Sequence, residues 1–85
     1  MDTNEFRSAA KDMVVNFEKE MYNRNIKHQD VQVVFMSYVM GYMKTTMVIP
    51  ADKQDRYYEI SYSFINKKMY LDVYQKISTR VKELD

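Results

Sequence analysis

The side chains that could carry out chemistry in this 85-residue chain are few and scattered. His28 is the single histidine, and no cysteine or second histidine accompanies it at the spacing that a metal site or a proton relay needs. Asp52 and Asp55 stand close together, but two carboxylates are too few ligands for a calcium loop. The serines lack the glycine-flanked turn of a nucleophile elbow, and a single glycine does not make a phosphate-cradling loop. We therefore expect that the protein is not an enzyme and that it binds neither a metal ion nor a cofactor.

A second group of residues, rich in tyrosine and basic side chains, indicates recognition rather than catalysis. Tyrosine and arginine are common anchors of protein interfaces. Tyrosine rings beside lysines could also stack the bases of a single-stranded nucleic acid, although Glu59 and Asp72 are predicted to share their surface. A protein partner is the favoured interpretation and single-stranded nucleic acid is the alternative. The residues predicted to bind the partner here are Arg56, Tyr57, Lys68, Tyr70, Tyr74 and Lys76.

These side chains are positioned by a predicted β-hairpin with strands over residues 56–65 and 68–76. Alternate residues of the first strand are apolar, which is the period of a strand that is buried on one side. Asn66-Lys67 can form a two-residue turn, because asparagine tolerates the left-handed conformation. This turn sets a register in which Ile60 faces Val73. Apolar residues then meet on one face of the hairpin, and tyrosines gather on the other.

The first twenty or so residues have the pattern of an amphipathic helix. Asp2 and Glu5 have the spacing of a capping box. Charged residues such as Glu18 are predicted to lie mostly away from the apolar side. The apolar stripe consists of Phe6, Ala9, Ala10, Met13, Val14, Phe17 and Met21.

The segment over residues 31–47 has two interpretations. As a helix capped by Asp30, it has a continuous apolar stripe. As a hairpin that turns at Met40-Gly41, it has apolar residues on both faces, and methionine stands where a positive φ is required. We favour a helix through about Met43, followed by a first strand over residues 45–49.

Three apolar residues of this segment, Val33, Met36 and Met40, fall outside the main stripe of the favoured helix. They either widen the buried face of the domain or form a second apolar strip. In the second case they would contact a protein partner or a second copy of the chain, so a homodimer is included among the expected assemblies.

The last residues, with Ile77, Val81 and Leu84 spaced by four and three, predict a short C-terminal helix. The predicted fold is therefore a single α+β domain over residues 1–85. Two N-terminal helices pack on a small antiparallel meander, because a sheet that is apolar on one side must be covered.

Composition narrows the classes of function. A formal net charge of +1 does not fit a DNA mimic or a strongly basic binder of duplex DNA. The absence of cysteine is typical of a cytoplasmic protein. The most apolar window, residues 31–49, contains too many polar residues for a membrane span.

The abundance of Lys, Tyr, Met, Asn and Ile is typical of an AT-rich genome, and a short chain of this kind resembles accessory proteins of phages and mobile elements. We therefore predict a non-enzymatic accessory or regulatory module that binds a protein. An inhibitor of a host protein, acting in the host cytoplasm, is one form of this function.

Overall fold

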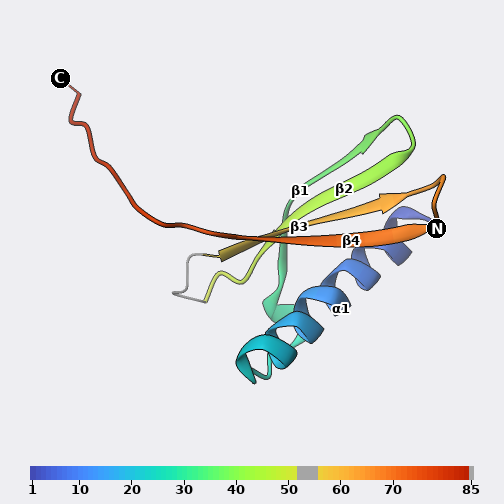
Figure 1. The fold of residues 1–85 in the computed structure, drawn as a ribbon, viewed down its shortest axis with the longest axis horizontal. Coiled ribbons are helices and arrows are strands. Elements are labelled where there is room, and N and C mark those ends of the chain that lie inside the picture. The colour runs from blue at the N-terminus through green and yellow to red at the C-terminus, as the bar shows by residue number, and fades with distance from the viewer. Residues whose placement is uncertain (52–55, 85) are drawn as a thin grey trace.

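One long helix and one antiparallel sheet make up the fold (Figure 1). The computed structural model describes residues 1–51 and 56–84. Helix α1 spans Thr3–Tyr22, and the short 3-10 helix η1 spans His28–Asp30. The sheet has the strand order β1-β2-β3-β4, so that each strand lies beside its neighbours in sequence. Its strands are β1 (Gln32–Val39), β2 (Tyr42–Val48), β3 (Arg56–Ser63) and β4 (Lys68–Gln75). The predicted α+β class is confirmed.

Helix α1 begins at the capping box expected from its sequence and ends at a left-handed asparagine. The backbone N–H of Glu5 donates to the Asp2 carboxylate at 2.8 Å, and the Glu5 side chain accepts from the Asp2 backbone N–H, which completes the predicted capping box. At the other end, Asn23 takes the left-handed conformation with φ of 53°, and its N–H donates to the carbonyl of Lys19.

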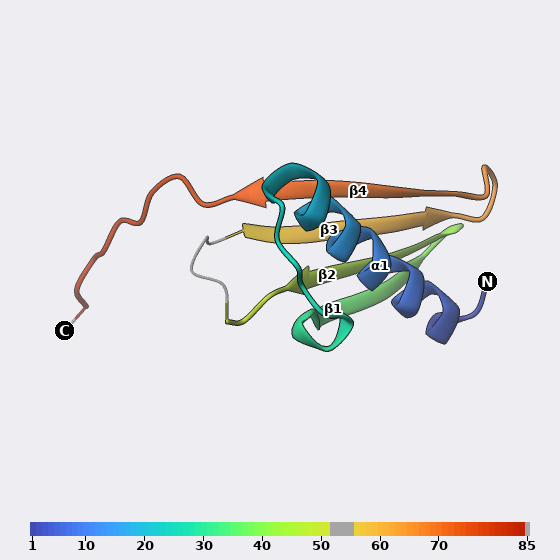
Figure 2. The ribbon, with the colours of Figure 1, turned by 90° about the horizontal axis from the view of Figure 1, so that it is seen from below.

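The helix lies across one face of the sheet, and the core fills the space between these two layers (Figure 2). We call this side of the sheet the covered face. Its strand residues follow the period of two, as shown by the pairings Thr45–Ile60 and Met47–Tyr58. The buried apolar residues of the core are Phe6, Ala10, Val14, Val31, Met43, Met47, Ile49, Tyr58 and Ile60.

The favoured helix over residues 31–43 is wrong, because this segment forms β1 and β2 instead. The two strands turn at Met40-Gly41, which is the hairpin alternative. Gly41 has a φ of 87°, and Met40 has a φ of 26° with its side chain 91% exposed. Strand β2 pairs with β1 on one side and with β3 on the other. These two ladders of backbone hydrogen bonds stabilise the strand and override the helical spacing of the apolar residues.

The hairpin predicted for strands 56–65 and 68–76 is present, with its pairing shifted by two residues. Ile60 faces Leu71 rather than Val73. The connection is a four-residue loop over 64–67, in which Lys67, rather than Asn66, takes the left-handed conformation with φ of 56°. A shift of two keeps each side chain on its face, because the side-chain period of a strand is also two. The predicted separation of the two faces therefore survives the change in register.

The predicted C-terminal helix is absent, because residues 76–84 have no regular secondary structure. This segment runs away from the sheet (Figure 1). Ile77, Val81 and Leu84 are 95%, 84% and 82% exposed, so that no apolar surface stabilises a helix here. The pair Asp52 and Asp55 lies outside the described residues.

Candidate functional site

We call the side of the sheet opposite α1 the open face, and no helix of residues 1–51 and 56–84 covers it (Figure 1). Its residues come from all four strands, at the positions that alternate with those of the covered face. The open face consists of Phe35, Ser37, Val39, Tyr42, Lys44, Thr46, Tyr57, Glu59, Ser61, Ser63, Lys68, Tyr70, Asp72 and Tyr74.

Four tyrosines stand on the open face and remain partly accessible to solvent. Tyr57, Tyr70 and Tyr74 are 42%, 44% and 40% exposed, and Tyr42 is 40% exposed. The first three were predicted to share this surface. Tyr42 was missed because its segment was expected to be helical, and the Met40-Gly41 turn was the signal that could have found it.

Two of these tyrosines form a stacked pair. Tyr57 and Tyr74 face each other across β3 and β4, with ring centroids 4.7 Å apart and ring planes 9° apart. The negative charge of Glu59, followed by partial burial and the charge of Asp72, raises the pKa of Tyr74 above its ordinary value. The stacked rings therefore lie next to carboxylates, and the Tyr74 phenol holds its proton more tightly than a free tyrosine.

A hollow of about 510 Å³ opens beside the tyrosines, large enough for a side chain of a partner. Strands β1 to β4 all contribute to its lining, which consists of Val39, Tyr42, Lys44, Ser61, Tyr70 and Asp72. Apolar and aromatic side chains with a few polar groups are the usual lining of a binding pocket.

Charges of both signs lie on the open face. Glu59 and Asp72 are direct cross-strand neighbours on β3 and β4. Lys44 on β2 donates from Nζ to Oε1 of Glu59 at 3.2 Å, which compensates one of the two carboxylates. Like charges directly opposite each other are unfavourable in a sheet, so that the centre of the open face favours a further positive group.

The other residues predicted to bind a partner lie elsewhere. The side chain of Arg56 is 5% exposed and lies on the covered side of the sheet, where it pairs with Glu18 of α1. Lys76 is exposed just after the end of β4. Val33 and Met36 are partly buried against the core, which is the first of their two predicted roles, and Met40 is at the tip of the β1–β2 hairpin.

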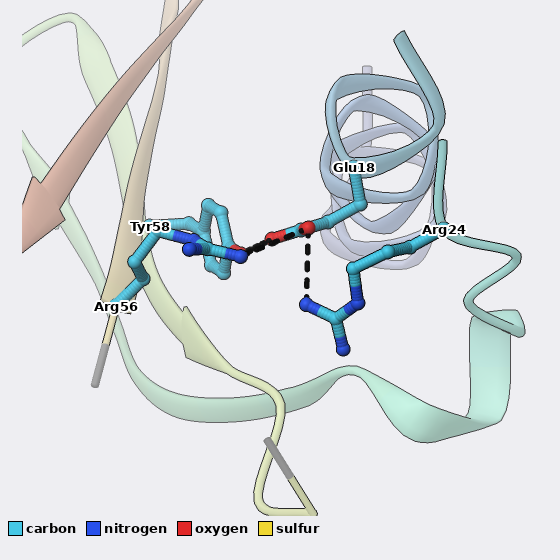
Figure 3. A network of polar contacts seen from close by, with 4 residues as sticks. All are labelled: Glu18, Arg24, Arg56 and Tyr58. Atoms are coloured by element: carbon cyan, nitrogen blue, oxygen red, sulfur yellow. Dashed lines mark hydrogen bonds and ion pairs between the residues drawn. The ribbon is translucent and has the colours of Figure 1, made fainter. Parts of the chain in front are cut away.

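A buried polar cluster joins α1 to β3 on the covered side (Figure 3). Glu18 is fully buried, and its carboxylate accepts hydrogen bonds from Arg56 at 3.1 Å, from Arg24 at 3.2 Å and from the Tyr58 hydroxyl. The Arg56 guanidinium also lies 4.1 Å from the centre of the Tyr22 ring. A buried carboxylate needs such partners to offset its lost hydration.

The surroundings of this cluster change the pKa of the Tyr58 hydroxyl. Burial, together with the adjacent Glu18 carboxylate, raises the pKa of Tyr58 to about 12. The cluster was missed from the sequence, where Glu18 was assigned to the polar side of the helix. The signal was the spacing of four that links Glu18 to the buried Ala10 and Val14.

The side chain of His28, in η1, contacts two residues of α1. Its Nε2 lies 3.0 Å from the Asp12 carboxylate and 3.2 Å from the Ser8 carbonyl oxygen. Both neighbours can only accept, so that Nε2 carries the hydrogen. Within residues 1–51 and 56–84, no group of three or more acidic or histidine side chains gathers where it could hold a metal ion.

The part of the chain that the structure describes contains no helix with the length and apolar content required to cross a lipid bilayer.

Comparison with known protein families gives a match over most of the chain. A family described as "Family of unknown function (DUF6275)" matches residues 7–84, which include α1 from its second turn and all four strands. No curated protein and no solved structure matches the chain.

Proposed function

The chain belongs to DUF6275, and we propose that it is a non-enzymatic module that binds a protein partner through its open face. The observation that carries this proposal is the gathering of four partly exposed tyrosines on the open face, where two of them, Tyr42 and Tyr70, line a hollow and no helix of the described residues covers them.

Tyrosine supports this function for a physical reason. Its ring contributes a large apolar contact area, its hydroxyl can hydrogen bond at the edge of an interface, and few rotatable bonds are immobilised on binding. Interfaces depend mainly on a few such anchors, which cluster near their centre. Tyr42 and Tyr70 line the hollow from β2 and β4, and are therefore the proposed anchors.

The charges of the open face favour a protein partner with a basic side chain. Glu59 and Asp72 lie together, and Lys44 pairs with only one of them. An arginine of the partner could form an ion pair with Asp72 and stack on an adjacent tyrosine ring.

The role that follows is that of an accessory or regulatory module. By covering a surface of its partner, the module would block or modify the activity of that partner. The composition supports a more specific role. In it, a phage or mobile element encodes the chain, and the chain inhibits a host protein in the host cytoplasm.

Capture of the partner from a lysate of the native host tests this function. Immobilised wild-type protein is compared with Tyr42→Ala and Tyr70→Ala. We expect each variant to weaken capture by about tenfold or more, as expected for an interface anchor. Tyr38→Ala is the control, because Tyr38 is 69% exposed and lies outside the open face. Equal capture by the wild type, both variants and the control would contradict the proposal.

Single-stranded nucleic acid is the second candidate ligand. The stacked pair of Tyr57 and Tyr74 supports it, since bases stack on exposed aromatic rings. Glu59 and Asp72 on the same face weaken it, because they repel phosphates. Fluorescence anisotropy with labelled oligonucleotides at two salt concentrations tests it. Binding that weakens with salt and is lost in Lys68→Ala would support nucleic acid, and absent or salt-independent binding would exclude it.

A further inference from the structure

The two edges of the sheet differ in charge. Strand β4 carries Lys68 and Asp72, whereas the eight residues of β1 include no charged residue. An edge strand leaves backbone N–H and C=O groups unpaired, and proteins usually place charges, prolines or bulges there to prevent pairing with another chain. Strand β1 has a bulge between Val33 and Phe35, which distorts its first part alone. The regular part over residues 35–39 has none of these protections.

Large apolar side chains are also exposed on both sides of this edge. Phe35 and Val39 are 60% and 54% exposed on the open face, and Tyr38 is 69% exposed on the opposite side. A strand that pairs with β1 would therefore bury apolar surface on both faces.

The ladder between β1 and β2 determines which residues can pair at the free edge. The pair Val39–Tyr42 closes the two-residue turn and is a hydrogen-bonded pair, as in such hairpins generally. Hydrogen-bonded and non-hydrogen-bonded pairs alternate along an antiparallel ladder, so that the backbone groups of Ser37 also bond to β2. The backbone N–H and C=O groups of Met36 and Tyr38 therefore face the free edge.

These positions make β1 complementary to itself. In an antiparallel pair with a two-fold axis at Ser37, Met36 of one copy faces Tyr38 of the other, so that the outward-facing backbone groups meet. Phe35 then faces Val39 of the other copy on the open face. Apolar residues pair with apolar residues, and no like charges meet because β1 has none.

We propose that β1 pairs antiparallel with β1 of a second copy of this chain about an axis at Ser37, joining two four-stranded sheets into one continuous sheet. The open faces of the two copies lie on the same side of this sheet. The pairing does not depend on the proposed function, because it uses the backbone edge of β1 rather than the proposed anchors, Tyr42 on β2 and Tyr70 on β4.

A single cysteine tests the axis, because the chain contains no cysteine of its own. In Ser37→Cys, the two thiols meet in a non-hydrogen-bonded antiparallel pair, whose Cα separation suits a disulfide. We expect rapid formation of a disulfide-linked dimer under mild oxidation. Tyr70→Cys, on the other edge strand, is the control. Equal or slower cross-linking of Ser37→Cys than of Tyr70→Cys would overturn the proposal.

Charges at the same position provide the second test. Sedimentation equilibrium of the wild type is expected to show a monomer–dimer equilibrium from low micromolar to near-millimolar concentration. Ser37→Glu and Ser37→Lys place like charges opposite each other, and each should raise the dimer Kd by about tenfold or more. An equimolar mixture of the two variants should restore association, because the introduced carboxylate of one copy then faces the introduced ammonium group of the other. Circular dichroism confirms that each variant is folded. A wild type that stays monomeric throughout, or variants that dimerise as well as the wild type, would overturn the proposal.

Discussion

The two faces of the sheet are built from the same four strands and differ in what lies on them. On the covered face, α1 excludes water, and the polar groups of Glu18, Arg56 and Tyr58 satisfy one another. On the open face, tyrosines and charges remain partly hydrated. The difference indicates that burial makes the polar cluster a structural tie, whereas exposure leaves the tyrosines available to a partner.

The largest effect is expected when the buried carboxylate of Glu18 is removed. Glu18→Ala leaves the Arg56 guanidinium buried without its carboxylate, and we expect a loss of about 3–5 kcal/mol in the free energy of unfolding, measured by urea denaturation. Glu20→Ala is the matched control, because Glu20 is an exposed acid on the same helix. Similar stability of the two variants would show that the cluster is not a structural tie.

A smaller effect is expected when the same cluster is titrated. The folded protein holds the phenolic proton of Tyr58 more tightly than the unfolded chain, because its pKa is raised from 10 to about 12. This stabilisation is complete below pH 10 and is lost as the pH rises through about 12, with a total of about 2–3 kcal/mol.

Denaturation of the wild type and Tyr58→Phe between neutral and strongly alkaline pH measures this loss. The variant lacks the phenol and should have lower stability at neutral pH with a shallower decline above pH 10. Parallel curves for the two proteins would argue against the raised pKa.

The smallest effect is expected on the open face. The stacking of Tyr57 on Tyr74 should contribute a coupling of about 0.5–1.5 kcal/mol, measured by a double-mutant cycle of Tyr57→Ala and Tyr74→Ala. All three variants should stay folded, because both side chains are about 40% exposed. A coupling as large as the effect of Glu18→Ala would remove the distinction between the two faces.

The part of the fold that could be predicted from sequence is the part whose two faces differ in polarity. In β3 and β4, apolar and polar residues alternate, and the faces were correct even though the pairing was shifted by two residues. The exact pairing depended on a four-residue loop over 64–67, which the sequence does not distinguish from a two-residue turn.

The β1–β2 hairpin lacks this alternation. Phe35 and Val39 are apolar on the solvent side, so that the apolar residues also fit a helical stripe. The deciding interaction, the pairing of β2 with β3, is between segments distant in sequence. For the same reason, Tyr42 and Lys44 were absent from the predicted site, whereas Tyr57, Tyr70 and Tyr74 were included.

The predicted C-terminal helix failed for a related reason. The spacing of Ile77, Val81 and Leu84 is helical, but a short helix is stable only when a surface of the protein packs against its apolar side. The structure provides no such surface for residues 76–84.

The order of the strands has a consequence for how the chain reaches its native state. Every strand pairs with the next one in sequence, so that the strands find their partners during folding through short loops, without a crossover connection. The entropy lost when each loop closes is therefore small, and each hairpin can form before α1 docks. A meander of this kind is expected to fold faster than a sheet of equal size assembled from remote segments.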